Sequence, residues 1–304
     1  MKILNRKSFV VLGAALLGTL ASACSSTIGG TTGDAPLGSN AEPAAHTSPR
    51  LYVLDCGSIQ FPDVAAFGLT NEETPVRELV VPCYLVDHPQ GTLLWDAGLP
   101  ASLAGNSNPV PMPGGGGGTV IYDRSLEAQL KDLGFATKDI DKVAFSHMHF
   151  DHTGSANLFT SSQMLIQQTE FTAAFEEAEK FEGVFVPELY SELANTRRRI
   201  LNGDHDVFGD GSVQIISAPG HTPGHQVLQL MLSNSGPLIL SGDLYHFRFS
   251  RENRRTPVFN YNAEQTLKSM DKVEALVAEL GAKFWIQHDT ALYKTLRRSP
   301  AYYD

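Results

Sequence analysis

One short segment of the chain concentrates side chains that bind metal ions. Residues 146–152 read Ser-His-Met-His-Phe-Asp-His, so His147, His149, Asp151 and His152 fall within six positions. Neutral imidazole and carboxylate groups bind zinc, iron, cobalt and manganese, and no cysteine lies nearby to complete a closed structural zinc site. The segment follows the apolar run 143–145, which is typical of a buried strand. A loop at a strand end holds side chains rigidly and leaves room for substrate, so we predict a metal site rather than a surface turn.

Three further polar residues each follow a strand-like segment. His221 lies in a turn rich in proline and glycine, Asp243 follows an apolar run that ends at a glycine, and His288 follows a short apolar run. A single catalytic zinc takes three protein ligands and a water molecule. Seven candidate ligands therefore indicate two metal ions. We expect the nearby His225 to support the His221 turn by hydrogen bonds rather than to bind metal.

Together these residues resemble the dinuclear site of the metallo-β-lactamase superfamily. The resemblance assigns one metal ion to His147, His149 and His221. It assigns the second ion to Asp151, His152 and His288, with Asp243 bridging both. It extends from about Leu51 to the C-terminus and implies an α+β fold, the four-layer αββα sandwich. The implied cofactors are two divalent ions, zinc first, with iron, cobalt or manganese also compatible.

Within that superfamily, several segments are similar to those of the N-acyl homoserine lactonases. They are Val81–Val86, Leu94–Gly98, Ser146–Gly154 and Trp285–Asp289. The similarity implies an enzyme that opens the lactone ring of bacterial quorum signals, and the expected substrate is a small lactone. Two metal ions that share a water molecule would lower its pKa and hold the resulting hydroxide as nucleophile. Asp151 could orient this nucleophile and carry its proton.

One position departs from the lactonase pattern. That family has a tyrosine three residues after the bridging aspartate, where this chain has His246, and Tyr245 stands one position earlier. Either side chain could donate a hydrogen bond to the alkoxide that forms as the ring opens. Extended backbone would point the two side chains in opposite directions. We therefore predict that His246 is catalytic and keep Tyr245 as the alternative.

Other functions fit the ligand set less well. Zinc β-lactamases generally lack the bridging aspartate that Asp243 would supply. Thioester hydrolases of the glyoxalase II kind share all seven ligands, but they usually carry basic residues in a C-terminal extension, and only a short segment follows His288. The non-enzymatic alternative is a metal-binding lipoprotein without catalytic activity, and the complete ligand set argues against it.

The composition is that of an acidic globular enzyme. The chain has 304 residues, of which 42% are hydrophobic and 18% charged, which is enough for a substantial core. Its formal net charge is −10, and removal of the three cations at positions 2, 6 and 7 would make it −13. Phosphate backbones would be repelled, and the dense basic cluster Arg197–Arg199 is too small for a nucleic-acid surface. We expect no nucleic-acid partner, and the sequence leaves open whether the chain forms a homodimer.

The first 50 residues differ from the rest. Basic residues precede an apolar stretch over residues 9–20, which is shorter than the roughly 20 residues that span a bilayer. This pattern predicts a secretory signal peptide over residues 1–23. The segment Leu20–Cys24 is close to a bacterial lipobox, in which Cys24 would be lipidated, although Ala21 and Ala23 also fit ordinary cleavage. We expect export as a periplasmic or outer-membrane lipoprotein, with secretion as the alternative.

The remaining sequence divides into a linker and one folded domain. Residues 24–50 are rich in small and polar side chains, which predicts a flexible linker to a hydrolase domain over residues 51–304. Spacing predicts strands at residues 51–54, 79–86 and 92–95, and helices at residues 125–133, 169–180 and 263–280. A doubly wound parallel sheet also fits this alternation, but it gathers ligands from successive strand ends less naturally.

Two further features are left open by the sequence. Cys56 and Cys83 each lie in a strand-like run and would form either a disulfide, in an oxidising compartment, or two buried thiols. The glycine run 114–118 lacks the lysine of a phosphate-binding loop. We interpret it as a mobile loop that could border the site.

Overall fold

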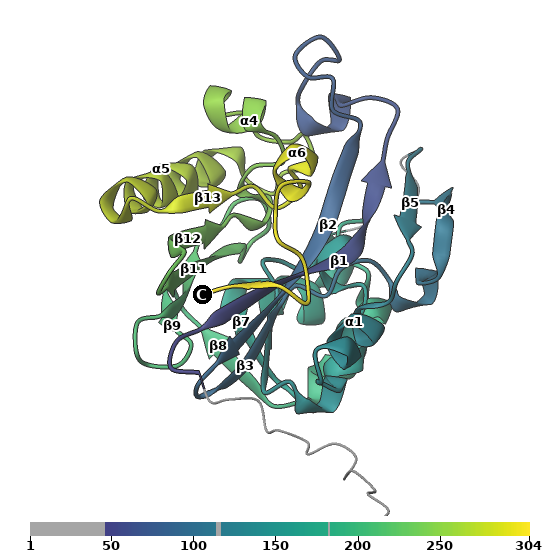
Figure 1. Cartoon of the computed structure of the whole chain (residues 1–304). Helices are drawn as coiled ribbons and strands as arrows, with labels where there is room; N and C mark the ends of the chain where they lie inside the picture. The colour runs from purple at the N-terminus through teal and green to yellow at the C-terminus, as the bar shows by residue number, and fades with distance from the viewer. Residues whose placement is uncertain (1–45, 114–116, 182) are drawn as a thin grey trace, which may run out of the picture. The chain divides into compact units, whose positions relative to one another are not determined.

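The structure is a computed structural model that describes residues 46–304, apart from residues 114–116 and residue 182. The predicted signal peptide, most of the predicted linker and part of the glycine run lie outside the described residues. The described residues belong to one compact unit, in which two β-sheets pack face to face with helices outside them (Figure 1). The predicted αββα sandwich is thus confirmed.

The first sheet contains nine strands among the described residues. Their order is β4-β5-β1-β2-β3-β6-β7-β8, with β14 paired to the start of β1. The neighbours from β3 to β8 run parallel, and the other pairs are antiparallel. The bounds are β1 (Arg50–Gln60), β2 (Glu78–His88), β3 (Gly91–Trp95), β4 (Asn106–Pro111), β5 (Thr119–Tyr122), β6 (Lys142–Ala144), β7 (Gln163–Gln167), β8 (Arg198–Leu201) and β14 (Tyr302–Tyr303).

The second sheet contains five strands within the described ranges, in the order β13-β12-β11-β10-β9. Its pairs are antiparallel except for β12 with β13, which run parallel. The bounds are β9 (His205–Asp206), β10 (Val213–Ser217), β11 (Gln226–Leu232), β12 (Gly236–Leu240) and β13 (Lys283–Trp285).

Helices cover the outer faces, with α1 against the first sheet and α5 against the second (Figure 1). The α-helices are α1 (Leu126–Asp132), α2 (Phe150–Thr153), α3 (Gln168–Phe171), α4 (Arg248–Asn253), α5 (Ala263–Leu280) and α6 (Thr290–Tyr293). Short 3-10 segments are η1 (Ala65–Phe67), η2 (Ala101–Leu103), η3 (Thr137–Asp139), η4 (Ala156–Phe159), η6 (Ala178–Lys180), η7 (Pro187–Leu189), η8 (Ser191–Asn195) and η9 (Gly242–Leu244). Among the described residues, no helix combines the length and apolar character that a membrane crossing requires.

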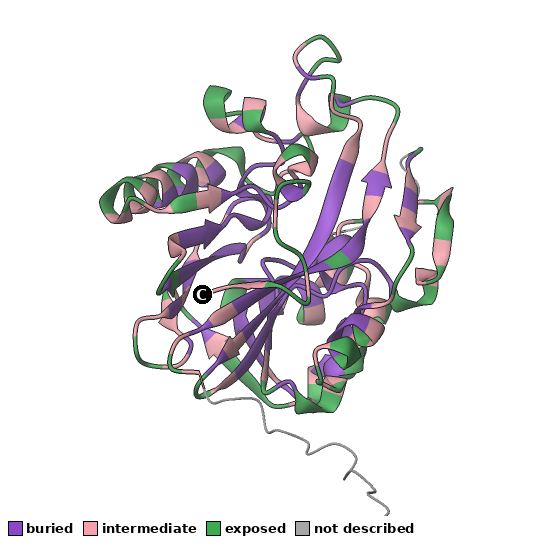
Figure 2. Cartoon of the chain, in the orientation of Figure 1, coloured by how far each residue is buried: buried purple, intermediate pink, exposed green. Residues whose placement is uncertain are grey.

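Alternation along the strands builds the layers. In β1, Leu51 points into the core between the two sheets, whereas Tyr52 points to the side covered by α1. In β10, Ile215 joins the core between the sheets, and the next residue, Ile216, packs against Met270 of α5. Figure 2 shows the result, with buried strands at the centre and partly exposed helices around them.

The predicted start of α1 is confirmed. The segment predicted as one helix over residues 169–180 is helical but divided into shorter pieces. The Ser125 hydroxyl accepts a hydrogen bond from the Ala128 amide at 3.2 Å, which caps α1. In this segment, α3 ends at Phe171, and the chain continues directly as a π turn, η5 (Thr172–Glu176). Phe171 stacks on Phe175 with centroids 4.9 Å apart. This aromatic packing accompanies a wider turn that regular helical spacing does not reveal.

A buried histidine ties the two sheets together away from the strand ends that carry the predicted ligands. Nε2 of His88, at the end of β2, lies 3.0 Å from both Asp210 Oδ2 and Ser212 Oγ, in the connection between β9 and β10. Its Nδ1 accepts a hydrogen bond from the Gln90 amide at 3.1 Å, and its ring stacks on Phe208. Burial lowers the pKa of His88, although Asp210 opposes the shift. The ring is therefore neutral at pH 7.

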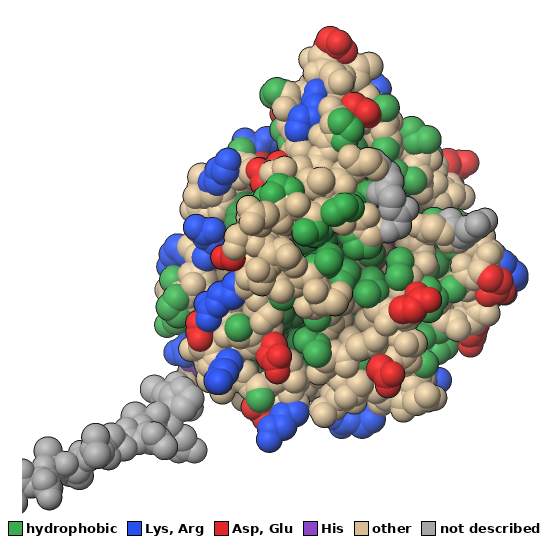
Figure 3. Space-filling model, turned by 90° about the vertical axis from the view of Figure 1, so that its right-hand side faces the viewer, with side chains coloured by type: hydrophobic (Ala, Val, Ile, Leu, Met, Phe, Trp, Pro, Cys, Tyr) green, Lys and Arg blue, Asp and Glu red, His purple; other side chains and the backbone are tan. Residues whose placement is uncertain are grey.

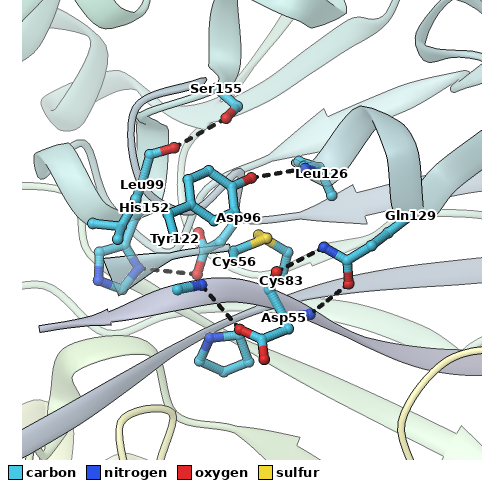
Figure 4. The surroundings of a disulfide bond; sticks show 12 residues. Asp55, Cys56, Cys83, Asp96, Leu99, Tyr122, Leu126, Gln129, His152 and Ser155 are labelled. Atoms are coloured by element: carbon cyan, nitrogen blue, oxygen red, sulfur yellow. Dashed lines mark hydrogen bonds and ion pairs between the residues drawn. A yellow bond between two sulfur atoms is a disulfide. The ribbon is translucent and has the colours of Figure 1, made fainter. Parts of the chain in front are cut away.

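Cys56 and Cys83 form a disulfide, which settles the alternative that the sequence left open. The bridge joins β1 to β2 next to an irregularity in their pairing. Figure 4 shows the bridge with Asp96 and His152 on one side and Asp55 and Gln129 on the other. Gly98 packs directly on it, since a Cβ there would lie 2.2 Å from Cys56 Cβ. The disulfide thus supports the turn that carries Asp96.

Candidate metal centre

Four segments converge at one edge of the sandwich and bring all seven predicted ligands together. They are the loop from β6 into α2, the loop between β10 and β11, the turn after β12, and the segment after β13. Strands that end at the same edge of a sheet place the residues that follow them side by side. Segments far apart in the sequence therefore meet here.

The first group contains His147, His149, His221 and Asp243, whose candidate ligand atoms all lie within 4.8 Å of one another. Nε2 of His221 lies 3.3 Å from Asp243 Oδ2 and 3.3 Å from Nδ1 of His149. Nε2 of His147 lies 3.6 Å from the same carboxylate oxygen. Three imidazoles thus surround one oxygen of Asp243.

The second group contains Asp151, His152 and His288, again within 4.8 Å of one another. Nε2 of His288 lies 2.9 Å from Asp243 Oδ1, and Nε2 of His152 lies 3.4 Å from it. Asp243 therefore presents Oδ2 to the first group and Oδ1 to the second. This is the arrangement expected of a bridging carboxylate.

The atoms that point into this space have the character of metal ligands. Nε2 of His147, His152 and His288 and Oδ1 of Asp243 are buried and lack a hydrogen-bond partner among the described residues. A buried polar atom without a partner costs about 1–3 kcal/mol, and such atoms are rare in folded proteins. Imidazole and carboxylate donors at these distances fit divalent cations.

Hydrogen bonds to the outer ring nitrogens fix the direction of the lone pairs. Nδ1 of His288 lies 2.7 Å from the carbonyl oxygen of Val80, which can only accept, so Nδ1 carries the hydrogen. Nδ1 of His221 lies 3.3 Å from Oδ1 of Asn260 in the same way. With the hydrogen on Nδ1, Nε2 of each ring can direct a lone pair into the site.

Asp96 organises the second group from behind. It accepts a hydrogen bond from the Ser146 amide at 2.6 Å and from Gln287 Nε2 at 2.6 Å, and its Oδ2 lies 3.1 Å from Nδ1 of His152. Its backbone has φ 60°, a conformation that non-glycine residues seldom adopt. The sequence points to the Asp96 segment only through a family resemblance, and this role of Asp96 was not predicted from it. An aspartate and a glycine directly after a strand were the available signal.

Burial and neighbouring charge set protonation states that suit metal binding. Burial lowers the pKa of His147 and of His149 well below the usual range, so both rings are neutral at pH 7. For Asp151, burial acts in the opposite direction, but the adjacent His152 holds its pKa at about 2. The first group therefore offers neutral imidazoles, and Asp151 is an ionised carboxylate. In the second group, burial is outweighed by carboxylates: Asp151 raises the pKa of His152, and Asp243 raises that of His288.

The prediction for His225 is confirmed by its contacts. Its Nδ1 lies 2.9 Å from the carbonyl oxygen of Ala218, and its Nε2 accepts a hydrogen bond from the Asp243 amide at 2.9 Å. Burial lowers the pKa of His225 to about 3. A neutral ring thus links the His221 loop to the backbone of Asp243.

The structure brings His246 to the centre and does not bring Tyr245. Nε2 of His246 lies 3.0 Å from Asp243 Oδ2. Tyr245 has extended backbone, with φ −145° and ψ 136°, so its side chain points the opposite way. It is buried beneath α5, with its ring centroid 5.9 Å from that of Phe284.

An apolar cavity of about 320 Å³ opens beside the two groups. Its polar lining includes His149, Asp151, Asp243, His246 and His288. Its apolar lining includes Ile59, Phe61, Phe67, Leu79, Met112, Phe150, Val184 and Phe259. Figure 3, which shows the side of the molecule that carries β4 and β5, has hydrophobic side chains gathered at its centre. The cavity can accept a small molecule with an apolar part.

Two loops that are distant in the sequence form part of this wall. The Val258 amide donates to the Ala66 carbonyl oxygen at 2.9 Å, which joins the segment after α4 to η1. The rings of Phe67 and Phe259 then lie 5.7 Å apart, and Phe67 lies 5.0 Å from His246. The place of Phe259 in this wall could not be predicted from the sequence, because no local pattern predicts contact between loops.

Comparison with known proteins agrees with this geometry. Residues 76–280 match the family model described as the metallo-beta-lactamase superfamily. The chain is 30% identical to N-acyl homoserine lactonase AttM of Azorhizobium caulinodans, over 85% of this chain and 100% of that one. It is 29% identical to N-acyl homoserine lactonase AiiA of Bacillus thuringiensis subsp. kurstaki, over 84% of this chain and 99% of that one.

A solved structure supports the same relationship. It is an N-acyl homoserine lactone hydrolase with the product N-hexanoyl-L-homoserine bound at the catalytic metal center. It superposes with a TM-score of 0.69 and 26% identity, over 84% of this chain and all of that chain. The chain therefore belongs to the metallo-beta-lactamase superfamily and, within it, to the branch of the N-acyl homoserine lactonases.

Proposed function

We propose that this metal-dependent hydrolase opens the lactone ring of N-acyl homoserine lactones with two divalent ions, outside the cytoplasm. The observation that carries the proposal is the position of Asp243, whose two oxygens face two separate groups of ligands. An apolar cavity adjoins both groups. Relatives that act on these lactones match the chain over most of its length.

The first ion would be held by His147, His149 and His221, the second by Asp151, His152 and His288, with Asp243 shared. The donor set suits zinc, and iron, cobalt or manganese are compatible. When bound, such ions supply Lewis acidity that activates water and polarises a carbonyl group near neutral pH. The remaining tasks fall to the side chains of the chain itself.

Asp151 is placed to manage the attacking water. Its carboxylate is ionised, because its pKa is held at about 2 by His152 against the effect of burial, and it lines the cavity. An ionised carboxylate accepts a hydrogen bond from water and can take its proton. The water oxygen then adds to the lactone carbonyl carbon with Asp151 holding its orientation.

His246 is placed to complete the reaction. Burial lowers the pKa of His246, so the ring is neutral, and its Nε2 lies 3.0 Å from Asp243 Oδ2 and carries a hydrogen in one of the two neutral tautomers. As the bond between the carbonyl carbon and the ring oxygen breaks, Nε2 can donate that proton to the ring oxygen, which becomes the hydroxyl of the product. The apolar wall would hold the acyl chain of the substrate while this occurs.

We further propose that the mature protein is exported, either lipidated at Cys24 or cleaved after Ala23. The N-terminal sequence and the Cys56–Cys83 disulfide support this proposal, since disulfides persist in oxidising compartments. Mass spectrometry of the N-terminal peptide after expression in a Gram-negative host tests it. A diacylglyceryl group on Cys24, lost in Cys24→Ala, is expected. A protein that keeps residues 1–23 would contradict it.

The activity is tested by measuring hydrolysis of hexanoyl and decanoyl homoserine lactones by the purified, metal-loaded protein. We expect rapid ring opening that a chelator abolishes and that His149→Ala reduces at least 100-fold. A β-lactam and a thioester serve as comparison substrates. Activity on either of these, with none on lactones, would keep the hydrolase and reject the lactone substrate.

A further inference from the structure

Glu170 is a buried carboxylate whose hydrogen bonds join two loops of the site. It lies in α3 and is 2% exposed. Its Oε1 accepts a hydrogen bond from the Met148 amide at 2.9 Å, and its Oε2 accepts one from the Gly224 amide at 2.7 Å. These partners are main-chain amides rather than a cation. Burial of a charge is costly, and hydrogen bonds from amides offset part of that cost.

The two amides belong to loops of different sheets. Met148 stands between His147 and His149, after β6 of the first sheet. Gly224 lies in the His221 loop, between β10 and β11 of the second sheet. The first ligand group draws its imidazoles from both loops. The distances between the ligand atoms of this group therefore depend on the spacing of the two loops. The Glu170 carboxylate contacts both loops.

Neighbouring contacts make this link direct. The Thr169 hydroxyl donates to the Pro223 carbonyl oxygen at 2.9 Å. A Cβ on Gly224 would lie 2.5 Å from the Glu170 nitrogen, so the His221 loop packs against α3 without space for a side chain. The Gln226 amide also donates to the Ser146 carbonyl oxygen at 2.8 Å. The start of α3 is thus the common support of both loops.

We propose that Glu170 is a positioning residue for the first metal ion, because it sets the spacing between the His147–His149 segment and the His221 loop. It lies behind the ligands and has no part in binding substrate. The inference rests on the proposed metal centre but not on the identity of the substrate. The second group has its own supports, with Asp96 behind His152 and the Val80 carbonyl behind His288. Loss of Glu170 should therefore weaken the binding of the first ion more than that of the second.

Metal affinity of the full protein with Glu170→Gln tests the proposal. Glutamine keeps the size of the side chain but replaces one accepting oxygen with an amide nitrogen that cannot accept from a main-chain amide. Competition with a chelator would measure the binding of each Zn²⁺ ion, and the visible spectrum of Co²⁺-loaded protein would report the geometry of each site. We expect one ion to bind 10–100-fold more weakly and the other to keep its wild-type affinity.

Two further variants keep the test decisive. Glu170→Asp retains the carboxylate on a shorter side chain, so it should lose less affinity than Glu170→Gln, and it replaces that variant if glutamine prevents folding. Gln129→Ala is the matched control. Gln129 is also buried and bridges α1 to β1, with its Oε1 2.9 Å from the Asp55 amide and its Nε2 2.7 Å from the Asp55 carbonyl oxygen. The Gln129→Ala variant should have a lower free energy of unfolding and unchanged affinity for both ions.

Wild-type affinity for both ions in Glu170→Gln would overturn the proposal. So would a parallel weakening of both ions that Gln129→Ala reproduces at equal loss of stability, because Glu170 would then support the fold alone. The readout involves no substrate. A wild-type protein that binds two ions but leaves lactones intact would reject the proposed substrate and leave this inference standing, whereas one that binds no ion would remove both.

Discussion

Asp243 and His288 occupy matching positions beyond two neighbouring parallel strands. β12 pairs with β13 so that Leu240 lies opposite Trp285, and each of the two site residues comes three positions later in its own segment. Asp243 Oδ1 and His288 Nε2 consequently lie 2.9 Å apart. The register of one strand pair therefore sets how the shared carboxylate faces the second ligand group.

Asp243 faces both ligand groups, so we predict that its substitution is the most damaging single change. Asp243→Asn should lower the content of both ions and reduce kcat/KM for lactones more than about 100-fold. The loss should exceed that caused by removing a residue that only supports a ligand, because Asp243 is itself a candidate ligand. Metal analysis together with steady-state kinetics measures this. Asp271→Asn, at an exposed surface pair with Arg254, should leave both quantities unchanged. An Asp243→Asn protein with two ions and normal kinetics would argue against a shared ligand.

His246 and Tyr245 form a matched pair of test positions. His246→Phe should reduce kcat for lactones by roughly 100-fold or more while metal content stays the same, because a proton donor is lost and the ligands remain. Tyr245→Phe should leave kcat within about twofold, because that ring packs beneath α5. If Tyr245 is the donor instead, Tyr245→Phe should lose activity and His246→Phe should keep it. Steady-state kinetics of both variants decides between the two residues.

The apolar wall should create a preference for longer acyl chains. Each buried methylene contributes about 0.8 kcal/mol, or roughly a fourfold gain in kcat/KM, until the chain leaves the cavity. Phe61→Ala should therefore raise KM for decanoyl homoserine lactone about tenfold and change the hexanoyl value little. Val258→Ala, at a residue that is 76% exposed, is the control. An equal effect of Phe61→Ala on both chain lengths would place the acyl chain elsewhere.

His88 should make the stability of the metal-free protein depend on pH. Burial lowers its pKa in the folded chain, so below about pH 6.5 the unfolded chain takes up a proton that the folded chain refuses. Stability should fall as pH falls through this range, by at most about 1.4 kcal/mol per pH unit for this group. Urea unfolding between pH 7 and pH 5 measures the slope. A slope in His88→Gln as steep as in the wild type would assign the effect to other groups.

The disulfide should stabilise the fold chiefly through the unfolded chain. It closes a segment with a sequence separation of 27. The loop entropy of such a segment corresponds to about 3.5 kcal/mol. In the double variant Cys56→Ala with Cys83→Ala, the free energy of unfolding measured by urea titration should be lower by that amount. Because Gly98 packs on the bridge, the turn with Asp96 should also loosen, and the second ion should be held less tightly. Unchanged metal affinity in the double variant would separate the bridge from the metal centre.

The convergence of the candidate ligands could be predicted from sequence because each follows a strand or a turn with a strong local signal. The apolar runs before Ser146, Asp243 and His288 are short and end abruptly, which marks where a buried strand stops. The opposite directions of Tyr245 and His246 follow from the two-residue repeat of extended backbone. These features depend on neighbours along the chain, so the sequence carries them.

Features that depend on contacts between distant segments could not be predicted. The π turn after Phe171 accompanies packing on Phe175, and the contact between Phe67 and Phe259 joins loops far apart in the chain. Glu170 gave no signal, because its role exists only once α3 meets loops from both sheets. The disulfide stayed open because two apolar strands suit a bridge and free thiols equally well.

Since the two sheets contribute ligands to the same centre, bound cations would cross-link the halves of the sandwich in the folded chain alone. Ions that bind only the folded state shift the unfolding equilibrium, by about 4 kcal/mol when the free ion exceeds its Kd a thousandfold. The temperature at which the protein melts would then rise and fall with the free metal concentration of its surroundings. An unchanged sequence could thus be robust in one environment and fragile in another.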